Sequence, residues 1–247
     1  SIDLGFNHKS GLFVNGGYTR NNHGGWQGDL TGREKRWHPK DQALMNGMFG
    51  FQNRNMNVWY RLDFLDEKIF GPNNGSELQP EKVSDKDFLT KRYTHQLQSD
   101  WNLDNRLDVH AALSYQDYKR RTRTTESDLS TGEKWLSSAE ASQDITQYKA
   151  WIARATVAWN IAPEFSVQPG VEYQWTQGEG GRIDGTPKVS DLAFFLSAEY
   201  KPWEWLSLRP GVRTFIVADY DAPIAIPSVL TKFKLTKHMD LRLSYAY

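Results

Sequence analysis

Hydrophobic and polar residues alternate along much of the chain, most clearly between Asp104 and Tyr118. Every second residue there is apolar or aromatic: Leu107, Val109, Ala111, Leu113 and Tyr115. The intervening positions are mostly polar: Arg106, Asp108, His110, Ala112, Ser114 and Gln116. Because successive side chains of a strand point to opposite faces, this stretch is predicted to be a long strand with one apolar and one wet face.

The same alternation of apolar and polar residues recurs along the chain and predicts about twelve strands. Short polar turns are expected at 8–11, 52–55, 101–105, 161–164, 201–204 and 236–239. Long polar loops are expected at 21–40, 71–87, 121–143, 176–188 and 218–226. Strict alternation of short and long connections is typical of outer-membrane barrels, which have short periplasmic turns and long external loops.

The charges of the predicted strands gather on one face. That face carries Arg61, Asp63, Asp108, Arg154, Glu172, Arg209, Arg213 and Arg242. An Arg or Lys facing lipid at the bilayer midplane costs about 2–4 kcal/mol, so this face is expected to line a watery lumen. The sequence therefore predicts an all-β, antiparallel up-and-down transmembrane β-barrel, with residues 1–247 forming part of a single barrel domain.

Composition agrees with this prediction and excludes several classes of protein. Only 38% of residues are hydrophobic, yet 13% are aromatic, including 10 Trp. No run approaches the roughly 20 apolar residues that a membrane-spanning helix needs. The formal net charge is +0, which gives no electrostatic case for a nucleic-acid partner. The chain has no Cys, so disulfides, zinc–thiolate sites and thiol catalysis are excluded.

The main alternative is a soluble β-sandwich or barrel with its apolar face inward, for example a carbohydrate-binding domain. Alternation by itself is common in soluble antiparallel sheets. Strand length, the rhythm of the connections, and Trp or Tyr at the strand ends favour the membrane barrel. A self-contained twelve-stranded outer-membrane pore or lipid-modifying enzyme is a further alternative, although no catalytic motif singles out a nucleophile.

The connections also predict where the two chain ends lie. The first strand leads into a short turn and the last strand leaves one, so both ends are expected at the external side. Bacterial barrels normally begin and end on the periplasmic side. The chain is therefore expected to be an internal part of a longer barrel.

The C-terminal hairpin carries a resemblance to a known family. After the turn at 236–239, the run Asp-Leu-Arg-Leu-Ser-Tyr-Ala-Tyr at 240–247 resembles the middle of TonB-dependent outer-membrane receptors, where an xLRxSYAxGFRAPS run follows such a turn. Residues 60–68 are similar to early barrel strands of that family. The chain stops before the Gly-Phe-Arg-Ala-Pro part of the motif, so the match covers its less specific half.

The resemblance implies a barrel of 22 strands with an N-terminal plug that carries a TonB box. It implies a non-enzymatic receptor in the outer membrane of Gram-negative bacteria, in contact with the lipid bilayer and lipopolysaccharide. External loops would capture a scarce metal chelate or cofactor such as cobalamin, haem or a siderophore. The TonB–ExbB–ExbD complex would then drive uptake through the plug, which is not visible in this sequence.

The first long loop holds the best candidate ligand-binding residues. His23, Trp26, Trp37 and His38 lie there among several glycines. Aromatic rings can form a platform for a macrocycle, and imidazole can ligate haem iron. The alternative is a flexible external loop with interfacial Trp.

Two pairs of loop carboxylates are candidates for calcium, which prefers oxygen ligands: Asp85 with Asp87, and Asp219 with Asp221. The alternative is that these carboxylates are simply solvated, and no intrinsic cofactor is expected.

A short basic run, Arg120, Arg121 and Arg123, could meet anionic lipopolysaccharide or an anionic chelate, or be a solvated loop base. His95 and His110 are predicted on opposite faces of their strands, as packing or lumen residues.

Overall fold

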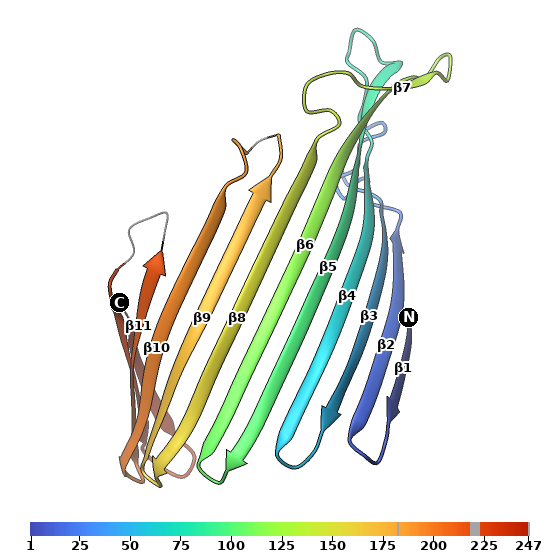
Figure 1. Ribbon diagram of the computed structural model, residues 1–247. Coiled ribbons are helices and arrows are strands. Elements are labelled where there is room, and N and C mark those ends of the chain that lie inside the picture. Colours follow the sequence, from blue (N-terminus) through green and yellow to red (C-terminus); the bar gives the residue numbers. More distant parts are fainter. Residues whose placement is uncertain (182, 218–222, 247) are drawn as a thin grey trace.

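The computed structural model describes residues 1–181, 183–217 and 223–246, which form one antiparallel sheet (Figure 1). The strands are β1 (Ile2–Asn7), β2 (Leu12–His23), β3 (Lys40–Gln52), β4 (Met56–Gly71), β5 (Lys82–Asp104), β6 (Leu107–Asp128), β7 (Lys134–Leu136), β8 (Ile145–Ala162), β9 (Phe165–Glu179), β10 (Lys188–Trp203), β11 (Leu206–Val217), β12 (Ile226–Lys234) and β13 (Asp240–Ala246). Each strand pairs with the next, except that β7 pairs only with β6, and β6 pairs onward with β8. No helix of the described residues is long and apolar enough to cross a membrane.

The predicted up-and-down order is confirmed, with short turns at one end of the sheet and longer loops at the other (Figure 1). The predicted loop boundaries at 71–87 and 121–143 are wrong. Strands β5 and β6 run on for 23 and 22 residues and project beyond their neighbours, pairing as far as Lys82 with Asp128. The loop between β6 and β8 then adds the short strand β7 to this ribbon.

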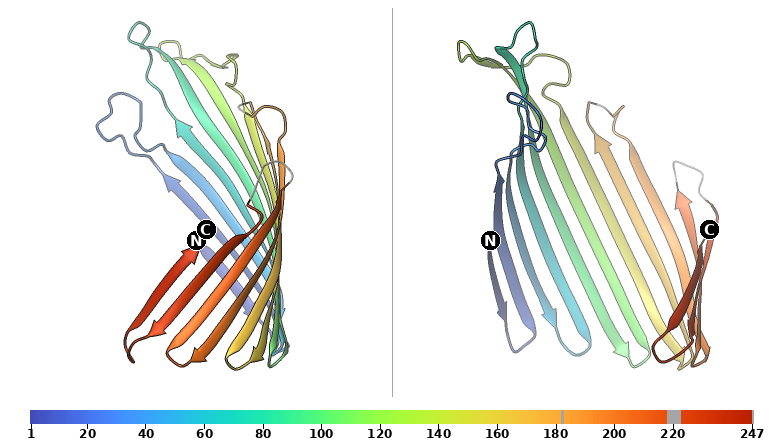
Figure 2. Two further views of the ribbon diagram at one scale, coloured as in Figure 1. Left: turned by 90° about the vertical axis from the view of Figure 1, so that its left-hand side faces the viewer. Right: turned by 180° about the vertical axis from the view of Figure 1, so that it is seen from behind.

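The sheet is open and curved. In the left-hand view of Figure 2 both edge strands, β1 and β13, curl to the same side of the middle strands, and in the right-hand view they stand apart. This shape is that of part of a barrel wall.

Glycines identify which face is concave. A Cβ added to Gly50 or Gly170, on the polar face, would meet the ring of Phe13 or Phe195. A Cβ added to Gly47, on the apolar face, would meet nothing within 4 Å. Side chains converge on the concave side of a curved sheet and diverge on the convex side. The polar face is therefore the concave one, as the prediction of a wet lumen requires.

The apolar rows do not meet in a dry core. Among the described residues the buried hydrophobic side chains are only Val83, Ala193 and Leu206. The rows expected to touch lipid are open: Leu4 is 75% exposed, Phe49 59% and Leu196 48%. A soluble protein could not leave such a continuous apolar surface in water, so the soluble β-sandwich alternative is wrong.

Aromatic residues border the apolar face on its loop side. In a row across β5, β6 and β8, ring centroids are 5.9 Å apart for His95–Tyr115 and 4.4 Å for Tyr115–Trp151. Trp151 then pairs with Trp175 on β9. We call the row His95, Tyr115, Trp151 and Trp175 the outer aromatic belt.

The second border lies near the short turns, where Trp159 closes the apolar row of β8. Trp151 and Trp159 are eight residues apart, about 26 Å along the strand. With a barrel-like tilt of 35–45° this distance gives an apolar band roughly 20 Å tall, close to the 25 Å typical of outer-membrane barrels.

The concave face is held by charge pairs and by arginines stacked on phenylalanine rings. The Glu172 carboxylate pairs with Arg213 and lies 3.7 Å from Arg154. The guanidinium of Arg154 lies 4.9 Å from the Phe195 ring centroid, and that of Arg213 lies 4.7 Å from the Phe215 centroid. These contacts satisfy charges that would be costly on the opposite, apolar face.

Candidate functional site

The first long loop, residues 24–39, borders an open hollow of about 770 Å³ at the loop end of the sheet. Its lining consists of Asn22, His23, Gly24, Gly25, Trp26, Arg36, Trp37, His38, Lys40 and Ile69. All four predicted ligand-binding residues line this one hollow, although they span 16 positions of the chain. The size falls within the 300–1,000 Å³ range of small-molecule sites.

A two-residue backbone bridge fixes the tryptophan pair. The Trp26 amide donates to the Trp37 carbonyl over 2.9 Å, and the Trp37 amide returns a bond of 3.0 Å. The two rings meet edge to face, with centroids 6.0 Å apart. Gly25 makes this closure possible: its φ is +77°, and a Cβ would come within 2.6 Å of the Trp37 carbonyl oxygen. The glycines of the loop therefore shape it, and the loop is ordered by its own hydrogen bonds.

Arg33 ties the loop to the neighbouring chain. Its Nη2 lies 2.6 Å from Asp85 Oδ2, its Nη1 donates to the Asn73 carbonyl, and its amide donates to Asn74 Oδ1 over 2.7 Å. Asn74 in turn donates to the Thr31 carbonyl over 3.0 Å. We call Arg33, Asn73, Asn74 and Asp85 the loop clasp. It joins segments about 40–50 residues apart, which no local pattern could have revealed.

The wall of the hollow is basic and aromatic. Arg36 and Lys40 line it together with the two histidines, and its lining contains no Asp or Glu. The Arg36 guanidinium is paired with Asp29 over 2.8 Å. Trp37 is 71% exposed and Trp26 56%, so their ring faces are open to a ligand. His38 also borders a second, smaller hollow of about 270 Å³ beside Gly71 and Phe88.

Of the two carboxylate pairs predicted to bind calcium, the structure describes one, Asp85 with Asp87. Asp85 and Asp87 lie on strand β5 and not on a loop, so their predicted setting is wrong. Asp85 belongs to the loop clasp, and Asp87 pairs with Arg123 and, at 3.3 Å, with Lys68. The described part of the chain contains no group of three or more potential metal ligands. Asp219 and Asp221 lie outside the described residues. Calcium binding stays a prediction, which the cationic partners of Asp85 and Asp87 disfavour.

The basic run is split between the two faces of β6. Arg120 lies on the concave face, with its guanidinium 4.3 Å from the Phe88 ring centroid. Arg123 lies on the convex face but is paired with Asp87. Arg121 is exposed on the convex face. The run therefore does not act as one cluster.

The two strand histidines lie on opposite faces, as predicted. His95, in the outer aromatic belt, has its Nδ1 2.6 Å from the Tyr60 hydroxyl, and His110 Nδ1 is 2.9 Å from Asp100.

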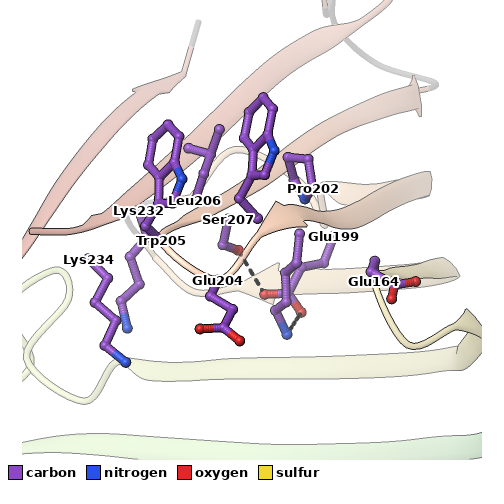
Figure 3. Close-up of a pocket in the computed structure, with 11 residues that line it drawn as sticks. Glu164, Glu199, Pro202, Glu204, Trp205, Leu206, Ser207, Lys232 and Lys234 are labelled. Carbon is purple, nitrogen blue, oxygen red and sulfur yellow. Dashed lines mark hydrogen bonds and ion pairs between the residues drawn. The ribbon is translucent and has the colours of Figure 1, made fainter. Parts of the chain in front are cut away.

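A further hollow of about 840 Å³ lies at the short-turn end, and sequence reasoning missed it (Figure 3). In the figure Glu204, Lys232 and Lys234 point away from the side on which Trp205 and Leu206 lie. Its central carboxylate, Glu199, accepts a hydrogen bond from Ser207 and lies near Lys201 and Arg209. Glu199 thus pairs with cations of the turn region, whereas Glu164, Glu204 and Lys234, which also line the hollow, form no salt bridge among the described residues.

Comparison with known proteins identifies the fold. No family model matches the chain, and no curated protein matches it. Similar solved structures include the outer membrane transporter YddB from Escherichia coli (TM-score 0.69, 13% identity, covering 94% of this chain and 35% of that one). A mutant of the ferric enterobactin receptor PfeA from Pseudomonas aeruginosa has a TM-score of 0.67 at 12% identity, covering 99% and 40%. The ferric yersiniabactin uptake receptor FyuA from Yersinia pestis has a TM-score of 0.59 at 12% identity, covering 96% and 42%.

The chain thus spans less than half the length of each of these three proteins. At such low identity the likeness shows a shared fold: the chain has the fold of part of an outer-membrane receptor barrel. The predicted fold class is confirmed.

Proposed function

We propose that the chain is part of the barrel of a TonB-dependent outer-membrane receptor that takes up a bulky, anionic metal chelate. The hollow lined by Trp26, Trp37, Arg36 and Lys40 carries this proposal, because it combines open aromatic faces with positive charge at the loop end of the sheet. Structures with the same fold include receptors for ferric enterobactin and ferric yersiniabactin, which supports uptake over an enzymatic role.

The membrane setting follows from the two faces of the sheet. The convex face is apolar, exposed and bordered by aromatic residues, as a lipid-facing surface requires. The concave face carries the paired charges and suits a wet interior. Placement in the outer membrane of a Gram-negative bacterium, with the long loops outside, is the arrangement that this sidedness supports.

The residues that line the hollow favour some of the three ligand classes that the sequence suggested, which are cobalamin, haem and siderophores. Flat rings stack on Trp, and the cations Arg36 and Lys40 attract carboxylates or catecholates. These features favour an anionic ferric siderophore, such as a catecholate complex, or haem with its two propionates, over cobalamin. His23 and His38 add imidazoles that could ligate haem iron.

The chain's own residues would act by capture. The tryptophan pair stacks the ligand, the two cations hold its negative charge, and the loop clasp keeps both in place. Passage into the periplasm would depend on a plug and the TonB–ExbB–ExbD system, which the resemblance implies for the whole protein.

Ligand titration of the purified protein in detergent tests the proposal. Ferric siderophores of catecholate and other types, haem and cobalamin are compared by quenching of Trp fluorescence. Trp37→Ala removes one stacking face and is expected to weaken binding about tenfold, or about 1.4 kcal/mol. Trp135→Ala is the matched control, because Trp135 is also an exposed loop-side Trp but lies outside the hollow. Equal affinities of both variants for every chelate, or no binding by the unaltered protein, would refute the proposal.

A further inference from the structure

One residue of the loop clasp, Asn74, is followed by a glycine, and the chain contains this Asn-Gly pair three times. Asn15–Gly16 lies in β2 and Asn46–Gly47 lies in β3, so both pairs belong to strands that are hydrogen-bonded on two sides. Asn74–Gly75 lies instead in the loop between β4 and β5. The following backbone nitrogen can attack an Asn side chain most readily when it belongs to glycine, which has no side chain to obstruct the approach. The three pairs share this chemistry, so their structural settings decide which of them reacts.

Both residues of the loop pair are required by their contacts. The Asn74 side chain accepts a hydrogen bond from the Arg33 amide and donates one to the Thr31 carbonyl. A Cβ on Gly75 would come within 2.4 Å of the Pro80 carbonyl oxygen, so a larger residue does not fit there. The fold therefore needs the asparagine and the glycine for separate reasons, and it places the reactive pair together inside the clasp.

The surroundings of the loop pair favour attack on the side-chain carbonyl. Among the described residues the Gly75 amide forms no hydrogen bond, whereas amides inside a paired sheet are held by the strand ladder. The Arg33 amide donates to Asn74 Oδ1 over 2.7 Å. Negative charge develops on this oxygen when a nucleophile adds to the carbonyl, and a backbone N–H aimed at the oxygen stabilises that charge. The attacking nitrogen is thus free and the carbonyl is polarised.

We propose that Asn74 is a site of self-modification, at which the side chain deamidates and releases the loop clasp. The Gly75 nitrogen loses its proton and forms a bond to Asn74 Cγ, while the Cγ–Nδ2 bond breaks and ammonia leaves with that proton. Water then opens the resulting succinimide ring at either of its carbonyls, which gives aspartate or isoaspartate. The reaction needs only water and base, and no atom is oxidised or reduced.

The product cannot restore the contact that Asn74 makes with the first loop. A carboxylate has no N–H to donate, so the oxygen that replaces Nδ2 would face the Thr31 carbonyl oxygen, which lies 3.0 Å from Nδ2 in the clasp. Two acceptors at that distance repel each other, and isoaspartate also reroutes the backbone through the former side chain. Deamidation therefore loosens the first loop once and irreversibly. This release does not depend on capture of any chelate.

Peptide mapping by mass spectrometry measures the conversion of each asparagine over time in the purified protein, kept folded in detergent at mildly alkaline pH. Asn15 and Asn46 are internal controls, because each is also followed by glycine. Asn74 is expected to convert at least about tenfold faster than either, since the strand pairs react only after their strands open. In denaturant the three sites should convert at similar rates. Conversion of Asn74 at the strand rate in the folded protein, or the same excess for Asn74 in denaturant, would overturn the proposal.

Two variants test the release of the clasp. Asn74→Asp places the carboxylate of the product in the clasp. Asn73→Asp adds the same charge one residue earlier, where only the backbone amide and carbonyl of Asn73 take part in the clasp. Protease cleavage within the first loop should become about fivefold faster in Asn74→Asp, through loss of the hydrogen bond to Thr31, and should change little in Asn73→Asp. Equal cleavage rates in the two variants would refute release by deamidation.

Discussion

Placing an arginine in the middle of the apolar band tests the sidedness on which the proposed function depends. Ala155 lies midway between Trp151 and Trp159 on the convex face of β8. If lipid covers that face, Ala155→Arg puts a charge near the bilayer midplane, at a cost of about 2–4 kcal/mol. The ratio of folded to unfolded protein should then fall about 30-fold or more.

Two further substitutions serve as controls for the added arginine. One changes its depth in the bilayer, and the other places it on the concave face of the sheet. Gln147→Arg lies on the same face and strand, but beyond the belt, where the cost should be about 0–1 kcal/mol. Ala112→Arg lies on the concave face opposite Arg154, so it adds only a cross-strand repulsion of about 0.2–1 kcal/mol.

The free energy of unfolding can be measured for all three variants by folding from denaturant into phosphatidylcholine vesicles. The 10 Trp of the chain report insertion through their fluorescence. The expected order of destabilisation places Ala155→Arg well above the other two. If Ala155→Arg cost no more than Ala112→Arg, the convex face would not contact lipid and the reasoning would fail.

Further predictions concern the loop clasp, the concave face and the loop-side ribbon. Arg33→Ala removes the cation that pairs with the partly buried Asp85 carboxylate, so opening of the first loop should become about 1–3 kcal/mol easier, seen as faster proteolysis there, whereas Arg36→Ala should change that rate little. Gly170→Val should lower the unfolding midpoint clearly because the concave face is crowded, while Gly47→Val on the open convex face should leave it nearly unchanged. The pKa of Asp128 is lowered by the side-chain and backbone hydrogen bonds that its own turn donates. The order that these bonds give the turn should therefore persist above pH 4 and be lost as the pH falls below the ordinary carboxyl range. Amide exchange in this turn that is equally slow at pH 7 and pH 2, after correction for intrinsic rates, would contradict this prediction.

The membrane-spanning part of the fold was predictable because one face of each strand must be apolar. The rows from Leu107 to Tyr115 and from Trp151 to Trp159 therefore show period-two alternation directly in the sequence. Beyond the outer aromatic belt both faces of the sheet contact water, so neither face has to be apolar. Apolar and polar residues therefore no longer alternate there, and the full length of β5 and β6 could not be predicted. Asp85 and Asp87 were expected on a loop for this reason, although pairing simply continues in register from Leu97 opposite Leu113.

The candidate site was likewise predictable only in part from the sequence. Residue types and glycines in the first loop indicated that His23, Trp26, Trp37 and His38 belong together, and the structure places them around one hollow. The clasp residue Arg33 had no local signal, because its partner Asp85 is 52 residues away and meets it only in the folded chain.

The sequence by itself determined the alternation of faces, the order of strands and the chemistry of the first loop, because each of these depends on neighbours in the chain. Only the tertiary structure decided which face is concave, which cations are paired and which stand free. Those properties depend on curvature and cross-strand register, which place residues distant in sequence, such as Lys91 and Lys119, directly opposite each other.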